Sequence, residues 1–396
     1  MQSPVTIGLN DKLARFDALQ NDIDYDLTET LIRNSRGRQM SGKTRTTALA
    51  TLLALIVTFS TQASEMTVVS WGGAHTHALE RVFYRPFNTK TGITVRSLHY
   101  DGHLGQIREQ VESNSVLWDV VDLGSDAMHR ACAEGLLETL PTDELPGHDP
   151  QSLNAGDFLA GSVSPCAVAY AAWSVVLAFP ESEGGVGAPA DGLERLFNPE
   201  LWPGKRSLIA SPRGLLEWAL ISEGVSPQYV YEHLQTREGQ ARAFGVLERI
   251  RADTEWRSTT GDRLEDILGD GVSVAMAYST DVFDARVRRN QAFQVVWGSH
   301  LFSLKYFGIP RGSHRFAEAW EFIRFAVSER HMPELLNWVA YGMTRDSAHT
   351  RIKPEYLELL PTSGENRAQA FVVDSAWWAR HGEELNAAFS AWLNDS

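Results

Sequence analysis

The sequence predicts a mixed α/β fold of two lobes, each a mixed sheet flanked by helices, joined by two crossing strands. Apolar runs rich in β-branched residues alternate with segments of helical spacing, which is typical of an open α/β sheet. Two apolar segments near 170–176 and 300–306 stand far apart in the chain, and we expect each to pass between the lobes. Polar and aromatic residues follow several predicted strands, where α/β sheets bind their ligands.

The stretch 67–74 (T-V-V-S-W-G-G-A) predicts the first strand and the loop after it, and 75–87 has helical spacing. Gly72 allows the backbone to approach a bound molecule, and the start of the helix offers free backbone N–H groups to a polar guest. Trp71 adds a flat apolar face at the same point. From the residues alone, Trp71 either lines a ligand site or packs in the core.

Two further strands are expected at 93–95 and 118–123, each followed by a helix. Because parallel strands end at one edge of a sheet, the residues after these strands should lie near Trp71. They are Tyr100, Asp101, Ser125 and Asp126.

The middle of the chain predicts the second lobe. The apolar run 167–179 is expected as two strand segments that cross into it, with Trp173 and Ser174 near the middle. Later segments predict helices at 210–223, 227–233, 240–251, 264–268, 282–287, 316–327, 333–337 and 376–393, and strands at 272–278, 293–297 and 302–309. Trp256 falls in a predicted loop.

These elements define the expected domains. Residues 64–172 and 302–345 form lobe 1, 173–301 forms lobe 2, and the C-terminal helices of 346–396 are left unassigned. Such an arrangement places a ligand in a cleft between the lobes, with closure by a hinge motion.

The N-terminal region carries an export signal. Lys43 and Arg45 precede the apolar run 48–59, and small residues follow up to Ala63, which together are typical of a cleaved signal peptide at 40–63. The run is too short to span a bilayer comfortably, although a buried helix is the alternative. We expect 1–39 to be a non-native N-terminal extension, with Met40 as the real start, and the mature protein to be periplasmic.

The net charge and the cysteine content limit the classes of function that the protein can have. The formal net charge of −14 argues against a nucleic-acid-binding protein. The two cysteines either pair in an oxidising compartment or remain separate buried thiols. No cofactor or metal is expected, and the protein is expected to be a monomer.

From residue 67 to its end the chain resembles the polyamine-type extracellular solute-binding proteins of ABC importers. The matching phrases occur in the family's order at 69–74, 100–102, 118–123, 132–138, 197–206, 277–278, 309–312, 341–344 and 377–378. The resemblance implies a periplasmic binding protein fold of type II that captures a polyamine or related amine and delivers it to a permease in the inner membrane. It also implies a disulfide between Cys132 and Cys166.

Carried over by position, the resemblance implies a cleft rich in aromatic and polar residues. They are Trp71, Tyr100, Ser125, Asp126, Trp173, Ser174, Trp256, Tyr278 and Tyr341. Aromatic walls suit the methylenes and the ammonium groups of an amine, and carboxylates suit its charged ends.

Two positions depart from the family. Asp281 stands where many relatives have arginine, and Lys305 stands where relatives commonly have an acid. Either Asp281 and Lys305 form an ion pair of reversed sign, or Lys305 binds a carboxylate or phosphate of the ligand. Both interpretations remain open from the sequence.

Two other classes of function compete with transport. A secreted hydrolase needs a nucleophile, a base and an orienting acid, but the sequence lacks G-x-S-x-G and H-E-x-x-H. A metal site could be drawn from the histidines at 75, 77, 99 and 103, although surface histidines are the simpler interpretation. A sensor that presents its ligand to a receptor would have the same fold.

Overall fold

The computed structural model describes residues 64–149, 156–181, 192–258, 263–269 and 271–395, and every structural statement below concerns these ranges. The predicted extension 1–39 and the signal peptide 40–63 lie outside them. None of the described helices is both long enough and apolar enough to cross a bilayer.

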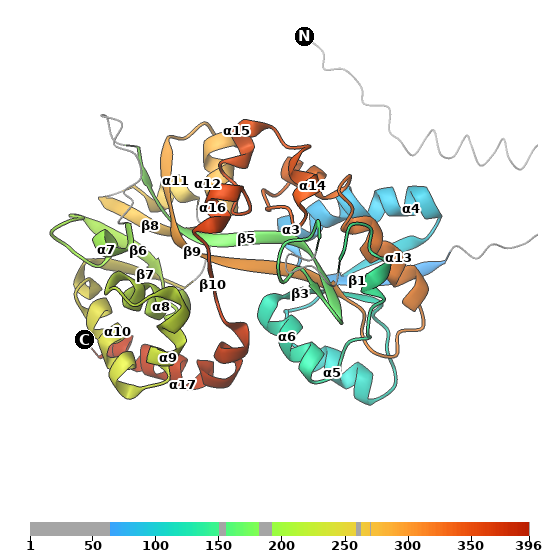
Figure 1. Ribbon diagram of the computed structural model, residues 1–396, viewed down its shortest axis with the longest axis horizontal. Coiled ribbons are helices and arrows are strands. Elements are labelled where there is room, and N and C mark those ends of the chain that lie inside the picture. Colours follow the sequence, from blue (N-terminus) through green and yellow to red (C-terminus); the bar gives the residue numbers. More distant parts are fainter. Residues whose placement is uncertain (1–63, 150–155, 182–191, 259–262, 270, 396) are drawn as a thin grey trace, which may run out of the picture. The chain divides into compact units, whose positions relative to one another are not determined.

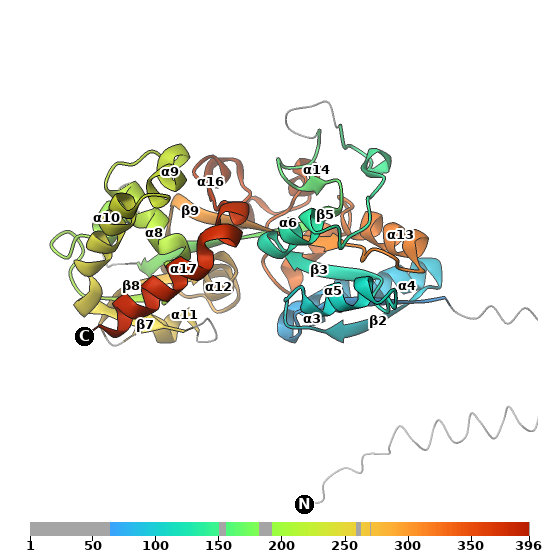
Figure 2. The ribbon, with the colours of Figure 1, turned by 90° about the horizontal axis from the view of Figure 1, so that it is seen from below.

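Two long antiparallel strands, β5 (Ala167–Pro180) and β9 (Phe293–Gly308), form the centre of a single sheet (Figures 1 and 2). The order of the main strands is β2-β1-β3-β9-β5-β8-β6-β7. β3 (Val120–Gly124) pairs with the last residues of β9, and β8 (Val272–Tyr278) pairs with the far end of β5. The two strands therefore cross from one part of the sheet to the other.

Both crossings were expected in the sequence, but as interrupted segments. The structure has one strand over 167–180 with register shifts, and one strand over 293–308 where two were predicted. The predicted break falls at Ser299, which keeps a left-handed φ of +54° inside the strand. The prediction of two separate strands there was wrong because a local irregularity does not end the pairing.

One end of the sheet, here called the β1–β3 side, contains three parallel strands and their helices. Its strands are β1 (Glu65–Ser70), β2 (Thr94–His99) and β3. Its helices are α3 (Gly73–Leu79), η1 (Glu80–Tyr84), α4 (Arg85–Thr91), α5 (Gly105–Glu112), α6 (Ser125–Ala133) and, from later in the chain, α13 (Phe316–Ala326).

The other end, here called the β6–β8 side, repeats this arrangement. Its strands are β6 (Lys205–Ile209), β7 (Thr254–Arg257) and β8. Its helices are α7 (Gly192–Leu196), α8 (Pro212–Ser222), α9 (Val230–Leu234), α10 (Arg237–Glu248), α11 (Leu264–Ile267) and α12 (Ser279–Phe283). Trp256, expected in a loop, lies in β7.

The remaining elements are short, except for the last helix. They are η2 (Thr142–Glu144), β4 (Val163–Ser164), η3 (Pro227–Tyr229), η4 (Arg251–Asp253), η5 (Asp284–Arg288), η6 (Met332–Asn337), α14 (Asp346–His349), α15 (Pro354–Leu357), α16 (Gly364–Ala368), β10 (Phe371–Val372) and α17 (Ser375–Asn394). The Asp374 carboxylate caps α17 by accepting from Trp377 N at 2.8 Å. α17 packs against α8 and also approaches α6.

Neighbouring strand residues face opposite sides of the sheet, and the core divides accordingly. Val68 and Val69 are fully buried in two different hydrophobic clusters, one on each face of the β1–β3 side. On the β6–β8 side, Leu177 and Val176 likewise enter separate clusters. Each end of the sheet is thus covered by side chains on both faces, as the predicted fold class requires.

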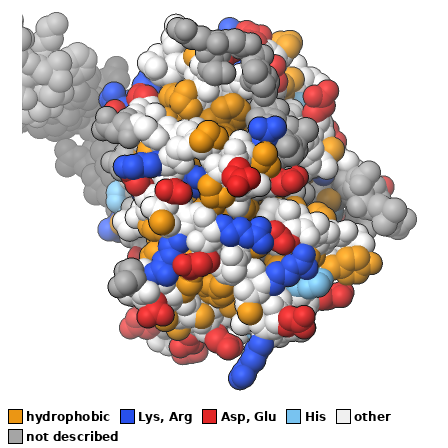
Figure 3. Space-filling model, turned by 90° about the vertical axis from the view of Figure 1, so that its left-hand side faces the viewer, with side chains coloured by type: hydrophobic (Ala, Val, Ile, Leu, Met, Phe, Trp, Pro, Cys, Tyr) orange, Lys and Arg blue, Asp and Glu red, His pale blue; other side chains and the backbone are white. Residues whose placement is uncertain are grey.

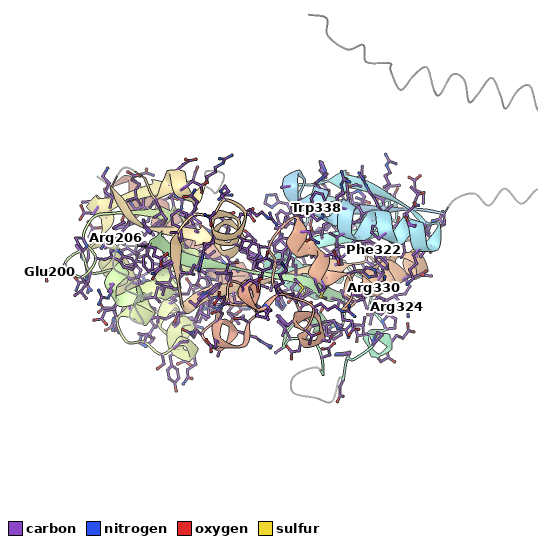
Figure 4. The ribbon with its side chains drawn as sticks, turned by 90° about the horizontal axis from the view of Figure 1, so that it is seen from above. Glu200, Arg206, Phe322, Arg324, Arg330 and Trp338 are labelled. Carbon is purple, nitrogen blue, oxygen red and sulfur yellow. A yellow bond between two sulfur atoms is a disulfide. The ribbon has the colours of Figure 1, made fainter. Side chains whose placement is uncertain are left out.

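Two residues labelled in Figure 4 show how the ends are held. Phe322 on α13 is fully buried in the core of the β1–β3 side. Arg206 in β6 is also fully buried, and its guanidinium donates to the carbonyl oxygens of Leu196, Trp202 and Gly204. Arg206 therefore fixes the loop before β6, and it is a structural residue. At the outer surface of this end, acidic and basic side chains are interspersed (Figure 3).

Candidate functional site

A cavity of about 470 Å³ opens where β5 and β9 pass between the two ends of the sheet. Its walls come from both sides: Trp71, Ser125 and Asp126 from the β1–β3 side, and Arg213 and Tyr278 from the β6–β8 side. The volume falls within the range of small-molecule sites in proteins. The cavity is therefore the candidate functional site.

Trp71 stands on the cavity wall and is 42% exposed, so it does not belong to the core. Its ring packs against Tyr100, with ring centres 6.0 Å apart. Gly102 lies so close below that a Cβ there would collide with the indole, and its φ of +82° also requires glycine. Gly72, with φ +86°, makes the turn that carries Trp71 from β1 into α3.

Polar groups lie at the edge of the β1–β3 side. The hydroxyl of Ser125 contacts Ser303 Oγ at 3.2 Å, donates to Leu304 O and accepts from Leu304 N. Ser125 and Asp126 form the first turn of α6, where backbone N–H groups are left free by the helix. Both residues were predicted from their position at the end of β3.

The chain turns sharply after β6, and Arg213 comes from this turn. Gly214 has a φ of +89°, and the structure interrupts the helical conformation at Arg213 and Gly214. Arg213 Nη2 donates to Asp126 Oδ1 at 2.8 Å and to Ser375 Oγ at 3.3 Å. Burial lowers the pKa of Arg213, and the charge of Glu217 opposes this shift.

Aromatic and apolar side chains complete the walls. Trp173 on β5 meets Tyr278 on β8 edge to face, with ring centres 5.1 Å apart. Val175 and Met276 line the cavity beside them. These side chains would contact an apolar part of a ligand.

A polar cluster lies behind Trp71, centred on the fully buried Asp122. Its carboxylate contacts His75 Nε2 at 2.6 Å, accepts from Ser70 Oγ at 2.7 Å and accepts from Tyr170 OH at 2.9 Å. Burial alone raises the pKa of Asp122, but His75, Lys305 and the Ser70 hydroxyl outweigh it and lower the pKa overall. His75 Nδ1 in turn contacts Tyr341 OH at 2.9 Å.

Lys305 connects this cluster to the cavity wall. Its Nζ lies 4.9 Å from the ring centre of Trp71 and 6.0 Å from that of Tyr341. Burial lowers the pKa of Lys305, and Asp122 opposes the shift. Within the described ranges Lys305 and Asp281 form no ion pair, so that interpretation of the two departures was wrong. Burial and the charge of Asp284 raise the pKa of Asp281 to about 6.

The cavity gathers five of the predicted site residues: Trp71, Ser125, Asp126, Trp173 and Tyr278. Five others lie close behind or beside them. Tyr100 donates to Asp122 O, Asp101 accepts from His103 N, Ser174 contacts buried His300, Tyr341 contacts His75, and Gly72 faces the His99 ring.

Trp256 lies elsewhere. Its ring packs against Phe389 and Trp392 of α17, in the core of the β6–β8 side. Arg213 was missed from the sequence. It follows a strand, as Ser125 does, but the phrase S-P-R-G was assigned to the helix after it.

The histidines considered for a metal site point to different partners. His75 contacts Asp122 and Tyr341, whereas His77 packs against Trp338 with ring centres 5.2 Å apart. The Cys132–Cys166 disulfide is confirmed, with a Cα–Cα distance of 6.0 Å, and it ties α6 to the start of β5.

The known proteins that this chain is similar to are solute-binding proteins. The family described as bacterial extracellular solute-binding protein matches residues 83–359. The gamma-aminobutyric acid-binding protein of Pseudomonas aeruginosa is 30% identical over 340 residues, which cover 86% of this chain and 94% of that protein.

Solved structures share the fold. A binding protein from Agrobacterium tumefaciens in complex with glucopine is 25% identical, with a TM-score of 0.64 over 83% of this chain and 99% of that chain. A spermidine/putrescine ABC transporter substrate-binding protein from Streptococcus pneumoniae is 16% identical, with a TM-score of 0.63 over 84% of this chain and 100% of that chain. The second likeness is one of fold alone.

Proposed function

This chain belongs to the bacterial extracellular solute-binding proteins, and we propose that its ligand is a small amine that also carries a carboxylate. Members of this family bind small molecules and deliver them to ABC permeases, and they are not enzymes. The family implies export to the periplasm. The class of ligand is inferred from the residues that line the cavity.

The observation that carries the proposal is the pair of opposite charges in one cavity. Arg213 offers a planar fork of donors that matches a carboxylate, and Asp126 offers a carboxylate that matches an ammonium. Without a ligand the two side chains neutralise each other. A zwitterionic ligand can separate them and bind both, with its carboxylate on Arg213 and its ammonium on Asp126.

The walls suit the rest of such a ligand. Trp71, Trp173 and Tyr278 provide flat apolar surfaces for a short chain of methylenes. The gamma-aminobutyric acid that the Pseudomonas relative is named for has this combination of groups, which supports the proposal.

A polyamine, the ligand first expected, fits these charges less well. Lys305 already places an ammonium against Trp71 and Tyr341, and Arg130 and Arg213 add further cations at the cavity. A ligand with two or more ammonium groups would meet several positive charges. We therefore favour an amine with a single ammonium and an acidic end, and we no longer favour the polyamine.

The expected domains complete the proposal. We propose that lobe 1 (64–172 and 302–345) and lobe 2 (173–301) move on the β5–β9 pair and close over the ligand. The clusters on the two sides of the sheet support this division. The C-terminal helices divide between them: Leu360 packs with the β1–β3 side, and Phe371 and Trp377 pack with the β6–β8 side. We also propose that 40–63 is removed as a signal peptide.

The test is a thermal-shift screen of residues 64–396 with four probes, followed by calorimetry. Gamma-aminobutyric acid should raise the melting temperature, because a ligand at 100 times its Kd stabilises by about 2.7 kcal/mol. Butylamine and butyrate, each with one of the two groups, should have smaller effects. A shift with putrescine and none with gamma-aminobutyric acid would restore the polyamine and refute this proposal.

A further inference from the structure

We infer that Glu217 is a positioning residue that fixes the turn of Arg213 to the C-terminal helix α17. The inference rests on the proposed function, because Arg213 is the residue proposed to bind the ligand's carboxylate. Glu217 lies one helical turn after Arg213 on α8 and does not line the cavity. It acts through its hydrogen bonds to other elements.

The Glu217 carboxylate is fully buried and accepts three hydrogen bonds. Oε2 accepts from Gly214 N at 2.7 Å, and Oε1 accepts from Trp378 Nε1 at 2.6 Å and from Tyr231 OH at 3.0 Å. These donors belong to the Arg213 turn, to α17 and to α9. One side chain therefore joins three elements.

The bond to Gly214 matters because it holds the turn that aims Arg213. Arg213 is extended, with ψ of 123°, and Gly214 is left-handed, so the regular helix begins only after Gly214. A Cβ at Gly214 would collide with Leu301, so this backbone position is closely packed. A glutamate three residues after a helix start commonly reaches back to a backbone N–H there.

What separates Glu217 from an ordinary capping glutamate is its second oxygen. A capping side chain at a surface leaves that oxygen in water. Here the oxygen accepts hydrogen bonds from the Trp378 indole and the Tyr231 hydroxyl. Burial raises the pKa of Glu217, and its hydrogen bonds oppose that rise. Burying a carboxylate without such donors would cost folding free energy. The three donors therefore hold the Glu217 side chain in this position.

The same network reaches Arg213 from the other side. Ser375, the first residue of α17, accepts from Arg213 Nη2 at 3.3 Å, and Asp374 N donates to Tyr231 OH at 2.8 Å. The start of α17 therefore contacts Arg213 directly and Glu217 through Tyr231. Glu217 holds the backbone N–H of Gly214, next to Arg213, and Asp126 and Ser375 hold the Arg213 guanidinium.

The test compares Glu217→Gln with the unchanged protein, residues 64–396. The carbonyl oxygen of a glutamine can accept from Gly214 N or from the two aromatic donors, but not from both sets. Its NH2 group, which can only donate, must then face the remaining donor, so at least one hydrogen bond is lost. Affinity for gamma-aminobutyric acid should fall about tenfold, and affinity for butylamine should change less than twofold. Hydrogen exchange of the Gly214 amide, measured without ligand, should become at least tenfold faster.

Trp218→Phe is the matched control, because Trp218 is the next residue on α8, is buried and donates a hydrogen bond to Ser299 O. It should lower the melting temperature without a selective loss for gamma-aminobutyric acid. An equal selective loss in Trp218→Phe would overturn the inference, as would unchanged affinity and Gly214 exchange in Glu217→Gln. If Glu217→Gln does not fold, Tyr231→Phe removes one donor and should give the same selective loss to a smaller degree.

The two proposals fail in different ways. If the unchanged protein does not bind gamma-aminobutyric acid, the proposed function is wrong, while faster Gly214 exchange in Glu217→Gln still supports the structural link. If the unchanged protein binds and the variant keeps both its selectivity and its slow exchange, the role of Glu217 alone is refuted.

Discussion

Arg213 Nη2 lies 2.8 Å from Asp126 Oδ1, and this contact joins the turn after β6 to the first turn of α6 across the cavity. The two residues stand 87 positions apart in the sequence and come from opposite ends of the sheet. The two side chains are 31% and 41% exposed, so water and a ligand can reach both. A ligand that enters between them has to replace both halves of this contact.

Arg213→Lys should weaken binding of gamma-aminobutyric acid by about 10- to 100-fold, because a hydrogen bond to a charged group contributes about 1.5–3 kcal/mol. Lysine keeps the charge but loses the planar fork. Calorimetry gives the affinities, and butylamine should bind both proteins equally. Arg130→Lys is the control, since Arg130 also lines the cavity. A larger loss there would place the carboxylate at Arg130.

Trp71→Ala should weaken ligand binding about tenfold and leave the melting temperature of the free protein within a few degrees. Trp71 is already 42% exposed, so its removal costs little packing. An aromatic contact to the ligand contributes about 0.5–1.5 kcal/mol beyond buried area. Trp338→Ala is the control, because Trp338 is matched in exposure, at 41%, and does not line the cavity. Full affinity in Trp71→Ala would remove Trp71 from the binding site.

Lys305→Met should shift selectivity toward diamines. The substitution removes the ammonium that faces Trp71 and Tyr341 and leaves the aromatic surfaces available to a ligand cation. We expect the affinity ratio of putrescine to gamma-aminobutyric acid to rise about tenfold, and Lys305→Arg to keep the original ratio because it keeps the charge. An unchanged ratio in Lys305→Met would mean that Lys305 does not select against diamines.

His300 should make stability fall in mild acid. It is fully buried between Ser174 Oγ and Asn366 O, and burial lowers its pKa from 6.5 to about 4. The unfolded chain takes up a proton first, so the stabilisation is complete above about pH 6.5 and is lost as the pH falls toward 4. The total loss is at most about 3 kcal/mol.

Urea unfolding at pH 7.5 and pH 5.0 measures this effect. The difference between the two pH values should be about 2 kcal/mol smaller in His300→Gln than in His129→Gln, the control at an exposed histidine. Equal differences in the two variants would show that His300 does not titrate in this way.

Reduction of the Cys132–Cys166 disulfide should destabilise the protein by about 3–4 kcal/mol, the amount that the chain-entropy model assigns to a loop of this length. The double variant with serine at both positions should show the same loss in urea unfolding and no further loss when reductant is added. A variant as stable as the oxidised protein would show that packing alone holds α6 to β5.

The sequence was sufficient to predict the fold class, because the strand–helix alternation is regular from β1 to β3. On the other side of the sheet β8 was predicted, whereas β6 and β7 were not. The β1–α3 turn around Trp71 and Gly72 was predicted from residues that are neighbours in the chain. The continuous β9 was not, because Ser299 and the polar residues beside it resemble a turn. Only pairing with β5 on both sides of residues 297–300 shows that the strand continues.

The site was predictable where position along a strand decided the outcome. Ser125 and Asp126 directly follow β3 and lie at the cavity. Tyr278, which also lines the cavity, was expected only from the family resemblance. Trp256 could not be assigned in this way, because an aromatic ring suits a core and a ligand site equally. Its surroundings depend on α17, more than 100 residues later in the chain. Arg213 was hidden because a proline followed by apolar residues also predicts the start of a helix.

The continuous pairing of β5 with β9 limits how the protein can deform. A ladder of backbone hydrogen bonds joins them from Ala167 and Gly308 to Pro180 and Phe293, interrupted by two register shifts. Such a ribbon resists being bent within its own plane, because that would stretch bonds along one edge, but it can be twisted about its length. Torsion at the two register shifts would therefore swing Arg213 away from Asp126 without breaking the ladder.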